Sequence, residues 1–194
     1  LKEVAINAGI PFFDLRKQIG YLRSLTIRTA NTGEIMVIVQ VTYDKPEWLE
    51  KILTSLVKEF PAITSLHYII NGKKNDTFHD QNIICWHGKP YITEVMPRPD
   101  GSGMLQFRVG PKSFYQTNSD QAFELYKIAW QMAGLTGSEL VYDLYTGTGT
   151  IANFIAGHAK KVIGLEYVSA AIDDAKINSQ INEIRNTEFY AGDI

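Results

Sequence analysis

The sequence has little that would tie the protein to a membrane or to an oxidising compartment. Cys85 is the single cysteine, so no intrachain disulfide can form, and a lone thiol is typical of a reducing, cytoplasmic setting. No apolar run reaches the roughly 18 residues of a membrane span. No basic segment followed by an apolar stretch indicates a signal peptide. We therefore expect a cytoplasmic protein without a membrane partner.

An excess of positive charge is also missing. The formal net charge is -2, so any contact with RNA must come from a local basic face. Basic residues interleaved with aromatic ones can neutralise and stack on single-stranded RNA. Such residues are Lys73, Lys74, Arg98, Arg108 and Lys112, with Tyr91, Phe107 and Phe114 between them. For most of them a solvated loop charge or a core aromatic is the simpler interpretation, and Lys112 is the one to test.

What is present is an ordinary globular composition. The chain has 194 residues, of which 45% are hydrophobic and 21% are charged, and this suits one or two domains. It starts at Leu1 rather than at methionine, and it stops at Ile194, just after a predicted strand. We expect both ends to be cut from a longer polypeptide.

The first 134 residues have the pattern of an α+β domain. Two β-rich runs, 25–29 and 34–41, flank turn residues, and a helix with an apolar face follows from Pro46. Further strands are predicted at 65–71, 83–86, 90–96 and 105–109, and a second helix at about 119–133. We predict that residues 1–134 form an α+β central domain that carries a candidate RNA contact.

From residue 135 the pattern alternates between strand and helix. Strands are predicted at 140–145, 161–166 and 187–190, and helices at 150–158 and 169–182. This order implies a parallel, doubly wound sheet. We predict an α/β fold in which residues 135–194 form the N-terminal half of a Rossmann-like domain. Half of such a sheet leaves an open edge and bare apolar faces, so self-association of the piece is a hypothesis.

A glycine turn between the first strand and helix of this second part is the most informative feature. Residues 147–152 fit the pattern G-x-G-x-x-G/A. Gly147 and Gly149 can adopt the left-handed backbone that brings the chain close to a nucleotide-like cofactor. Glu166 ends the next strand, where a carboxylate can bind ribose hydroxyls. These features alone fit NAD and S-adenosylmethionine equally.

Two further acids favour S-adenosylmethionine. Asp143 lies within the first strand, where an acid is common in methyltransferases of this fold, whose cofactor carries an ammonium on its methionine part. Asp193 follows the third strand, where it can accept a hydrogen bond from the adenine amino group. The competing interpretation is a structural glycine turn with solvated acids, and the match of four features to strand ends argues against it.

A second segment, Phe114 to Asn118, lies between a strand and a helix just before the alternating part. Gln116 offers both a donor and an acceptor, so it can bind a carboxylate or an amide without adding charge. From the residues alone, a polar helix entry with Asn118 or Ser119 as the cap explains the segment better.

Taken together, these segments resemble the RNA uracil-5-methyltransferase family. The pattern F-x-Q-x-N at 114–118 is followed by D-L-Y-x-G-x-G-T at 143–150 and then by V-x-G-x-E at 162–166. The segments 20–25 and 186–193 also look like parts of that family. The resemblance covers essentially the whole chain. It implies an enzyme that uses S-adenosylmethionine to form 5-methyluridine in RNA, with 23S ribosomal RNA favoured over transfer RNA.

The resemblance implies roles for individual residues. Gln116 would contact the cofactor, and Tyr145 would line its pocket. Gly147 and Gly149 would form the loop, and Thr150, which is often Asn in relatives, would open the helix beside it. Glu166 would bind the ribose hydroxyls and Asp193 would contact the adenine end. No metal site is expected.

The family's catalytic residues are not expected within this chain. In relatives a nucleophilic Cys adds to C6 of uracil and a Glu removes the C5 proton, and both follow a D-P-P-R segment further downstream. Cys85 lies in a strand far before the cofactor loop and is predicted to be a buried apolar thiol. We therefore assign no catalytic residue and expect the 194-residue piece alone to be inactive. Whether the full-length protein carries an iron–sulfur cluster stays open.

Two alternatives remain from the sequence. One is a non-catalytic RNA-binding module, built from residues 1–134, with a vestigial cofactor domain. The other is half of an NAD-binding oxidoreductase domain. Calorimetry with NAD and with S-adenosylhomocysteine would separate the second alternative from the leading hypothesis.

Overall fold

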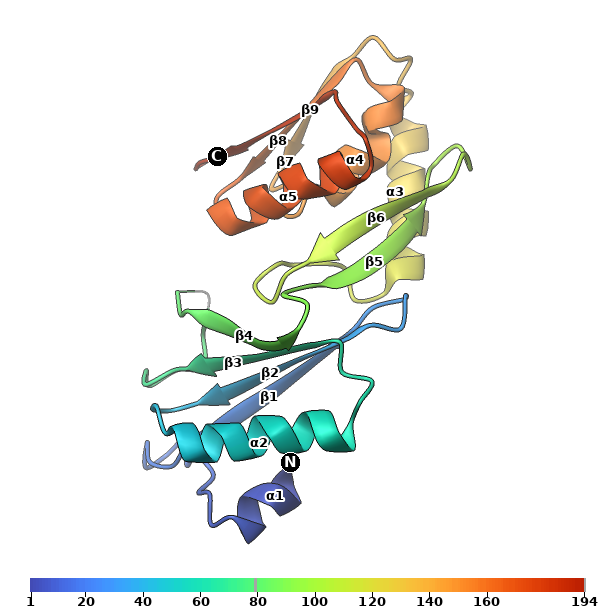
Figure 1. Ribbon diagram of the computed structural model, residues 1–194. Helices are drawn as coiled ribbons and strands as arrows, with labels where there is room; N and C mark the ends of the chain where they lie inside the picture. Colours follow the sequence, from blue (N-terminus) through green and yellow to red (C-terminus); the bar gives the residue numbers. More distant parts are fainter. Residues whose placement is uncertain (79, 194) are drawn as a thin grey trace. The chain divides into compact units, whose positions relative to one another are not determined.

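A computed structural model describes residues 1–78 and 80–193. The chain divides into two compact units, Leu1–Ile92 and Thr93–Ile194, each of which is described by itself (Figure 1). Within the described residues, no helix has both the length and the apolar character needed to cross a membrane.

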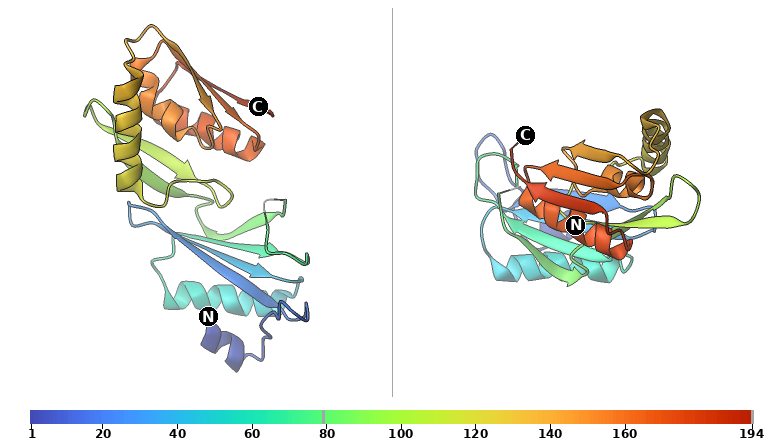
Figure 2. Two further views of the ribbon diagram at one scale, coloured as in Figure 1. Left: turned by 180° about the vertical axis from the view of Figure 1, so that it is seen from behind. Right: turned by 90° about the horizontal axis from the view of Figure 1, so that it is seen from above.

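The first unit is a four-stranded sheet with helices against one face. Its elements are α1 (Lys2–Asn7), β1 (Leu22–Thr29), β2 (Ile35–Val41), α2 (Pro46–Glu59), β3 (Ser65–Ile70) and β4 (Ile83–Gly88). The strands follow the order β1-β2-β3-β4, in which β2 and β3 are parallel and the outer pairs are antiparallel. A parallel pair needs a crossover, and α2 supplies it along one face of the sheet (Figures 1 and 2).

Local sequence explains these elements. Gly33 has a φ of +85°, and the turn closes with Ala30 N–H donating to the Glu34 carbonyl at 2.9 Å. Pro46 begins α2, as its fixed φ favours. The core under α2 combines one face of β2 with the apolar stripe of the helix. Its central members are Val37, Val39, Val41, Leu49, Ile52, Leu53 and Leu56.

The second unit combines a hairpin with a parallel sheet. Its elements are β5 (Ile92–Pro97), β6 (Met104–Val109), α3 (Ser119–Ala133), β7 (Leu140–Leu144), α4 (Thr150–Ile155), a 3-10 turn η1 (Ala156–His158), β8 (Lys161–Glu166), α5 (Ser169–Ile181) and β9 (Thr187–Ala191). Strands β5 and β6 form one sheet, and β7-β8-β9 form a second sheet that is parallel throughout. The predicted α/β class, with a Rossmann-like second part, is confirmed.

Only one face of the parallel sheet is covered by the described helices. On the covered face, next to α4 and α5, the side chains of Val162 and Phe189 are buried, and so is Gly164. On the opposite face of the sheet, apolar and aromatic residues of β7 and β9 are exposed; they are Leu140, Tyr142, Leu144 and Tyr190. A bare apolar face was expected from the sequence. Whether a second copy of the chain covers it stays a prediction.

The boundary expected near residues 134–138 lies inside the second unit, in the turn that follows α3. Gly134, with a φ of +57°, ends α3. The helix belongs to this unit because its aromatic rings pack on α4: the ring centroids of Phe123 and Tyr126 lie 6.0 and 5.9 Å from that of Phe154. The hairpin belongs to it because side-chain amides of α5 bind the backbone of β6. Sequence periodicity cannot show contacts of this kind between distant segments.

These contacts predict how the second unit responds to truncation. A polypeptide of residues 93–194 is expected to unfold cooperatively on heating, followed by circular dichroism. A polypeptide of residues 135–194 is expected to lack a cooperative transition, because it loses the partners of Phe154 and of the α5 amides. A sharp, matching transition in the shorter polypeptide would contradict this division of the chain.

Candidate functional site

The glycine turn lies at the edge where the parallel strands of the second unit end. Residues 145–149 join the end of β7 to the start of α4 (Figure 1). Because β7, β8 and β9 are parallel, Leu144, Glu166 and Ala191 end their strands at the same edge. In open α/β sheets this edge is the usual place for a ligand.

The two glycines have different roles in the turn. Gly147 has a φ of +56°, and a Cβ built on it would meet no atom within 4 Å, so its backbone faces open space. Gly149 has a φ of +75°, and a Cβ there would lie 3.0 Å from both the Ala175 Cβ and the Phe189 ring. Gly149 therefore lets the turn lie close against α5 and β9, while Gly147 presents bare backbone outward.

Tyr145 is also in a left-handed conformation, with a φ of +62°. For a bulky residue this geometry is strained by about 1–3 kcal/mol, and such strain gathers at functional sites. Its side chain is 72% exposed. The turn therefore presents an exposed tyrosine directly after β7, at the position predicted from the sequence to line the cofactor pocket.

The Asp143 carboxylate stabilises the turn by hydrogen bonds. Its Oδ2 accepts a hydrogen bond from the Thr146 hydroxyl at 2.6 Å and from the Ala152 N–H at 3.0 Å. One carboxylate thus joins the residue before Gly147 to the first turn of α4, whose N–H groups have no partner within the helix. Burial raises the pKa of Asp143 above its ordinary value, although both hydrogen bonds act against this shift. The structure gives Asp143 a structural task; the suggested contact with a cofactor ammonium stays a prediction.

Buried hydroxyl and amide groups complete the inner side of the turn. Thr148 and Thr150 are buried, and their hydroxyl oxygens lie 3.2 Å apart. The Asn153 side chain donates to the Gly149 carbonyl at 2.8 Å, and the Gly149 N–H donates to the Thr146 carbonyl at 2.9 Å. Thr150, assigned to the cofactor from the resemblance, therefore points its side chain into the protein interior.

Glu166 links the turn to the ends of the neighbouring strands. Its Oε2 accepts from the Gly147 N–H at 3.2 Å, and its Oε1 accepts from the Val168 N–H at 2.9 Å. Its main-chain carbonyl accepts from the Gly192 N–H at 3.0 Å. The structure thus brings Glu166 to Gly147 directly and places the exposed Asp193 one residue beyond Gly192, which follows β9.

The segment around Gln116 precedes α3. Asn118 caps that helix, since its Oδ1 accepts from the Gln121 N–H at 3.1 Å, as the helix-entry interpretation predicted. Tyr115 is buried and Phe114 is 70% exposed. Gln116 itself is exposed, and within the described part of the chain no hydrogen bond joins it to the glycine turn. Its assigned contact with the cofactor stays a prediction.

Cys85 corrects an expectation from the sequence. It was predicted to be buried, but it is exposed because β4 is the edge strand of its sheet. Its Sγ lies 3.8 Å from the carbonyl oxygens of His87 and Gly88. Partial desolvation raises the pKa of the thiol, and a thiol without a lowered pKa is not an activated nucleophile. Burial therefore no longer supports the prediction that Cys85 is not the nucleophile, whereas the direction of its pKa shift agrees with that prediction.

Several basic and aromatic residues considered for RNA binding have structural tasks. The Lys73 ammonium lies 2.5 Å from an Asp80 carboxylate oxygen, and the Arg98 guanidinium donates to the Asn182 carbonyl at 3.3 Å. Phe107 is fully buried. Lys112 is half-buried and stays the residue to test. Within residues 1–78 and 80–193, no cluster of His, Cys, Asp and Glu side chains could hold a metal ion.

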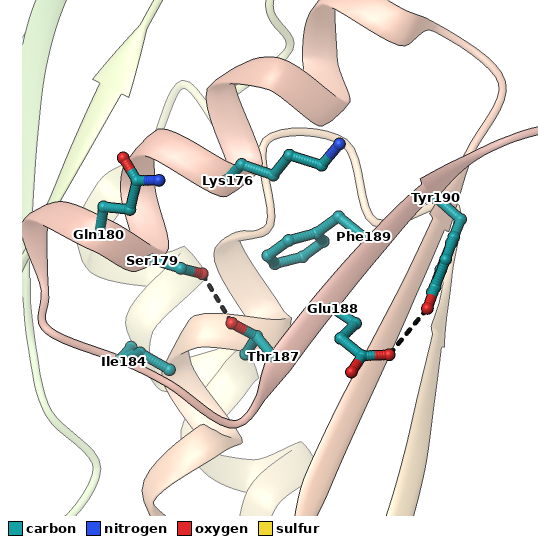
Figure 3. A pocket seen from close by; sticks show the side chains of 8 residues that line it. All are labelled: Lys176, Ser179, Gln180, Ile184, Thr187, Glu188, Phe189 and Tyr190. Carbon is teal, nitrogen blue, oxygen red and sulfur yellow. Dashed lines mark hydrogen bonds between the residues drawn. The ribbon is translucent and has the colours of Figure 1, made fainter.

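A hollow between α5 and β9 lies apart from the glycine turn. It measures about 320 Å³, and Figure 3 shows the side chains around it. Hydrogen bonds of 2.8 Å join Ser179 to Thr187 and Tyr190 to Glu188 along its wall. Residues 145–149 do not line this hollow. It therefore belongs to the outer edge of the sheet and not to the candidate site.

The buried polar residues that support the turn were missed by sequence reasoning. Asn153 and Asn178 are at most 1% exposed and hydrogen-bond backbone of the turn. A signal for Asn178 existed, because it lies on the same helical face as the buried Ala171 and Ala175. A polar residue on such a face indicates a specific buried partner.

The Asp143 geometry leads to a pH-dependent prediction. The folded state raises the pKa of this carboxyl, so folding favours its protonated form, and that contribution is lost as pH rises from the ordinary value through the folded one. Asp143→Asn keeps an acceptor without the charge. Its unfolding free energy relative to wild type is therefore expected to increase as pH is raised from about 4 to about 7.

Asp143→Leu serves as the comparison, because it also lacks the titrating group but removes the acceptor of both hydrogen bonds. Its difference from wild type should shift with pH in the same way, and it should be less stable than Asp143→Asn by about 1–3 kcal/mol at every pH. Thermal or denaturant unfolding across the pH range measures both variants. A constant difference between the wild type and Asp143→Asn would show that the carboxyl is not held in the described environment.

Comparison with known proteins places this site in a family context. No family model matches the sequence. An uncharacterized RNA methyltransferase of Porphyromonas gingivalis is 58% identical over 184 residues, which is 95% of this chain and 38% of the relative. A protein of the same description from Bacteroides thetaiotaomicron is 54% identical, over 100% of this chain and 42% of the relative. The chain thus spans about two fifths of the length of these curated relatives.

Solved structures agree with these relatives. The tRNA (uracil-54, C5)-methyltransferase of Pyrococcus abyssi, in complex with S-adenosyl-L-homocysteine, superposes with a TM-score of 0.76 at 27% identity, over 99% of this chain and 44% of that protein. Trm5b of the same organism shares the fold, with a TM-score of 0.51 at 16% identity, over 88% of this chain and 47% of that protein. The resemblance to the RNA uracil-5-methyltransferase family is thereby confirmed for the segment of these proteins that the chain matches.

Proposed function

We propose that the second unit supplies part of the S-adenosylmethionine site of an RNA uracil-5-methyltransferase. One observation carries the proposal: the open backbone of Gly147 lies at the strand edge where Glu166 ends β8 and where Asp193 follows the end of β9 by two residues. The Pyrococcus abyssi neighbour, similar over 99% of this chain, was solved with the demethylated form of that cofactor.

The carboxylate of Glu166 has capacity left for a ligand. Each oxygen of Glu166 accepts one backbone hydrogen bond, and a carboxylate offers about four lone-pair sites in all. The remaining sites can accept from the two ribose hydroxyls, which is the role proposed for Glu166. Asp193 is exposed and would accept from the adenine amino group.

The other residues of the proposed site act on the two sides of the turn. Gly147 and Tyr145 face outward and would contact the cofactor, and Gln116 would reach it from the segment before α3. Gly149 and Thr150 lie on the buried side of the turn. Gly149 would allow the close packing of the turn, and the Thr150 side chain would point away from the cofactor. A sulfonium methyl group bound here would be the donor for the C5 carbon of a uridine.

In the mechanism that the family resemblance implies, methylation at C5 of uracil uses a thiolate nucleophile that adds to C6. Cys85 belongs to the other compact unit, and its pKa is raised. We therefore propose that a cysteine outside these 194 residues attacks C6 of the target uracil and that this chain alone does not methylate RNA. Ribosomal RNA, in particular 23S, is proposed as the substrate ahead of transfer RNA.

Calorimetry on the 194-residue chain tests the cofactor assignment. S-adenosylhomocysteine is expected to bind more tightly than NAD, because it carries an ammonium and lacks the anionic pyrophosphate of NAD. The acids Asp143, Glu166 and Asp193 near the turn favour a cationic group over an anionic one. Glu166→Gln should weaken this binding about tenfold or more, since charge-assisted hydrogen bonds contribute about 1.5–3 kcal/mol.

Glu188→Gln is the matched control. Glu188 is also a strand carboxylate, but it pairs with Lys161 at 2.7 Å, away from the turn, so its replacement should leave the affinity unchanged. Tighter binding of NAD, or equal effects of the two substitutions, would contradict the proposal.

A further inference from the structure

Helix α5 carries a row of polar side chains that faces the hairpin strand β6. Asp174 and Asn178 lie in α5, and Asn182 is the residue that caps its C-terminal end. The three are spaced four residues apart, so they lie on one side of the helix and its end. Asn178 is fully buried and Asn182 is 8% exposed. Buried amides need partners, and the partners here are backbone groups far away in the sequence.

The two amides bind β6 as a neighbouring strand would. The Asn178 Oδ1 accepts from the Arg108 N–H at 2.7 Å, and its Nδ2 donates to the Arg108 carbonyl at 3.3 Å. The Asn182 Oδ1 accepts from the Gln106 N–H at 2.8 Å, and its Nδ2 donates to the Gln106 carbonyl at 2.7 Å. Each amide thus satisfies both backbone groups of one residue.

The spacing explains why this pairing fits. Four residues of helix rise about 6.0 Å, and two residues of strand rise about 6.6–6.8 Å. The amides of Asn178 in α5 and of the C-cap residue Asn182 can therefore meet residues two apart on β6. The edge of the two-stranded sheet, which would otherwise leave backbone groups unpaired, is closed by side chains of a helix.

Asn178 makes one bond that Asn182 does not. Its Nδ2 also donates to the Thr148 carbonyl, at 3.0 Å, between the two glycines of the turn. One turn earlier on the helix, Asp174 accepts a hydrogen bond from the Ser113 hydroxyl, three residues before Gln116. The row of side chains therefore touches both segments to which cofactor contacts are assigned.

We propose that Asn178 is a positioning residue for the glycine turn. Its amide fixes the Thr148 carbonyl against β6 and thereby sets the orientation of the outward-facing Gly147 backbone. Affinity for the cofactor then depends on a side chain that does not touch the cofactor. The affinity part of this inference rests on the proposed function, whereas the part that concerns the shape of the turn does not.

Paired substitutions separate positioning from general stability. Asn182 also donates to the Asn178 carbonyl, at 2.7 Å, so each of the two amides donates two hydrogen bonds. Asn178→Asp and Asn182→Asp each keep an acceptor for β6 and lose both donated bonds. Only the first leaves the Thr148 carbonyl without its donor. Each should lower the melting temperature of the 194-residue chain, so Asn182→Asp is a control that matches in chemistry and in place.

Hydrogen exchange in a peptide covering residues 144–153 gives the first readout. The N–H groups of Thr146, Gly147, Gly149 and Ala152 are bonded within the site, and none of them is bonded to Asn178. Each variant is measured at the same number of degrees below its own melting temperature. Under this condition, exchange of these four amides should be about tenfold faster in Asn178→Asp than in Asn182→Asp. Equal rates would overturn the proposal. If the aspartate variants do not fold, Asn178→Ala and Asn182→Ala provide the same comparison without added charge.

Affinity for S-adenosylhomocysteine gives the second readout. A roughly tenfold loss is expected for Asn178→Asp, while Asn182→Asp should stay close to wild type. Equal losses in both variants would reduce Asn178 to a purely structural residue. If the wild type binds no S-adenosylhomocysteine, the proposed function fails, and the exchange comparison alone decides whether Asn178 positions the turn.

Discussion

The candidate site depends on the two hydrogen bonds that the Asp143 carboxylate accepts at the glycine turn. A turn with three left-handed residues, one of them a tyrosine, is not stable by local preference alone. Asp143 joins the two ends of the turn through Thr146 and Ala152 and so maintains that backbone. The cost is a partly buried acid whose pKa is raised by burial.

The supports of the turn come from every element around it. Asn153 reaches it from α4, Glu166 from β8 and Asn178 from α5. Their hydrogen bonds all go to backbone atoms, so these three supports do not depend on the side chains of Thr146 and Thr148, whereas the bond to Asp143 requires the Thr146 hydroxyl. Gly147 is left facing open space. This division, with support on one side and bare backbone on the other, is what a preorganised ligand site requires.

Sequence reasoning predicted the elements well after residue 135, because short strands and helices in regular alternation leave few topologies. It also found the glycine turn, whose residue types follow directly from its backbone geometry. It missed Asn178, because the partner strand lies 70 residues earlier and no periodicity connects the two. It predicted Cys85 to be buried because an apolar strand does not reveal whether it lies in the middle or at the edge of a sheet.

The central claim is that an S-adenosyl ligand lies against the outer side of the glycine turn. The most direct test is to titrate the 194-residue chain with S-adenosylhomocysteine and to follow the glycine amide signals by nitrogen–proton NMR. The account predicts that the signals of Gly147 and Gly149 shift, while those of Gly33 in the first unit and Gly101 in the hairpin of the second do not. Shifts at Gly33 or Gly101 without shifts at Gly147 would contradict it.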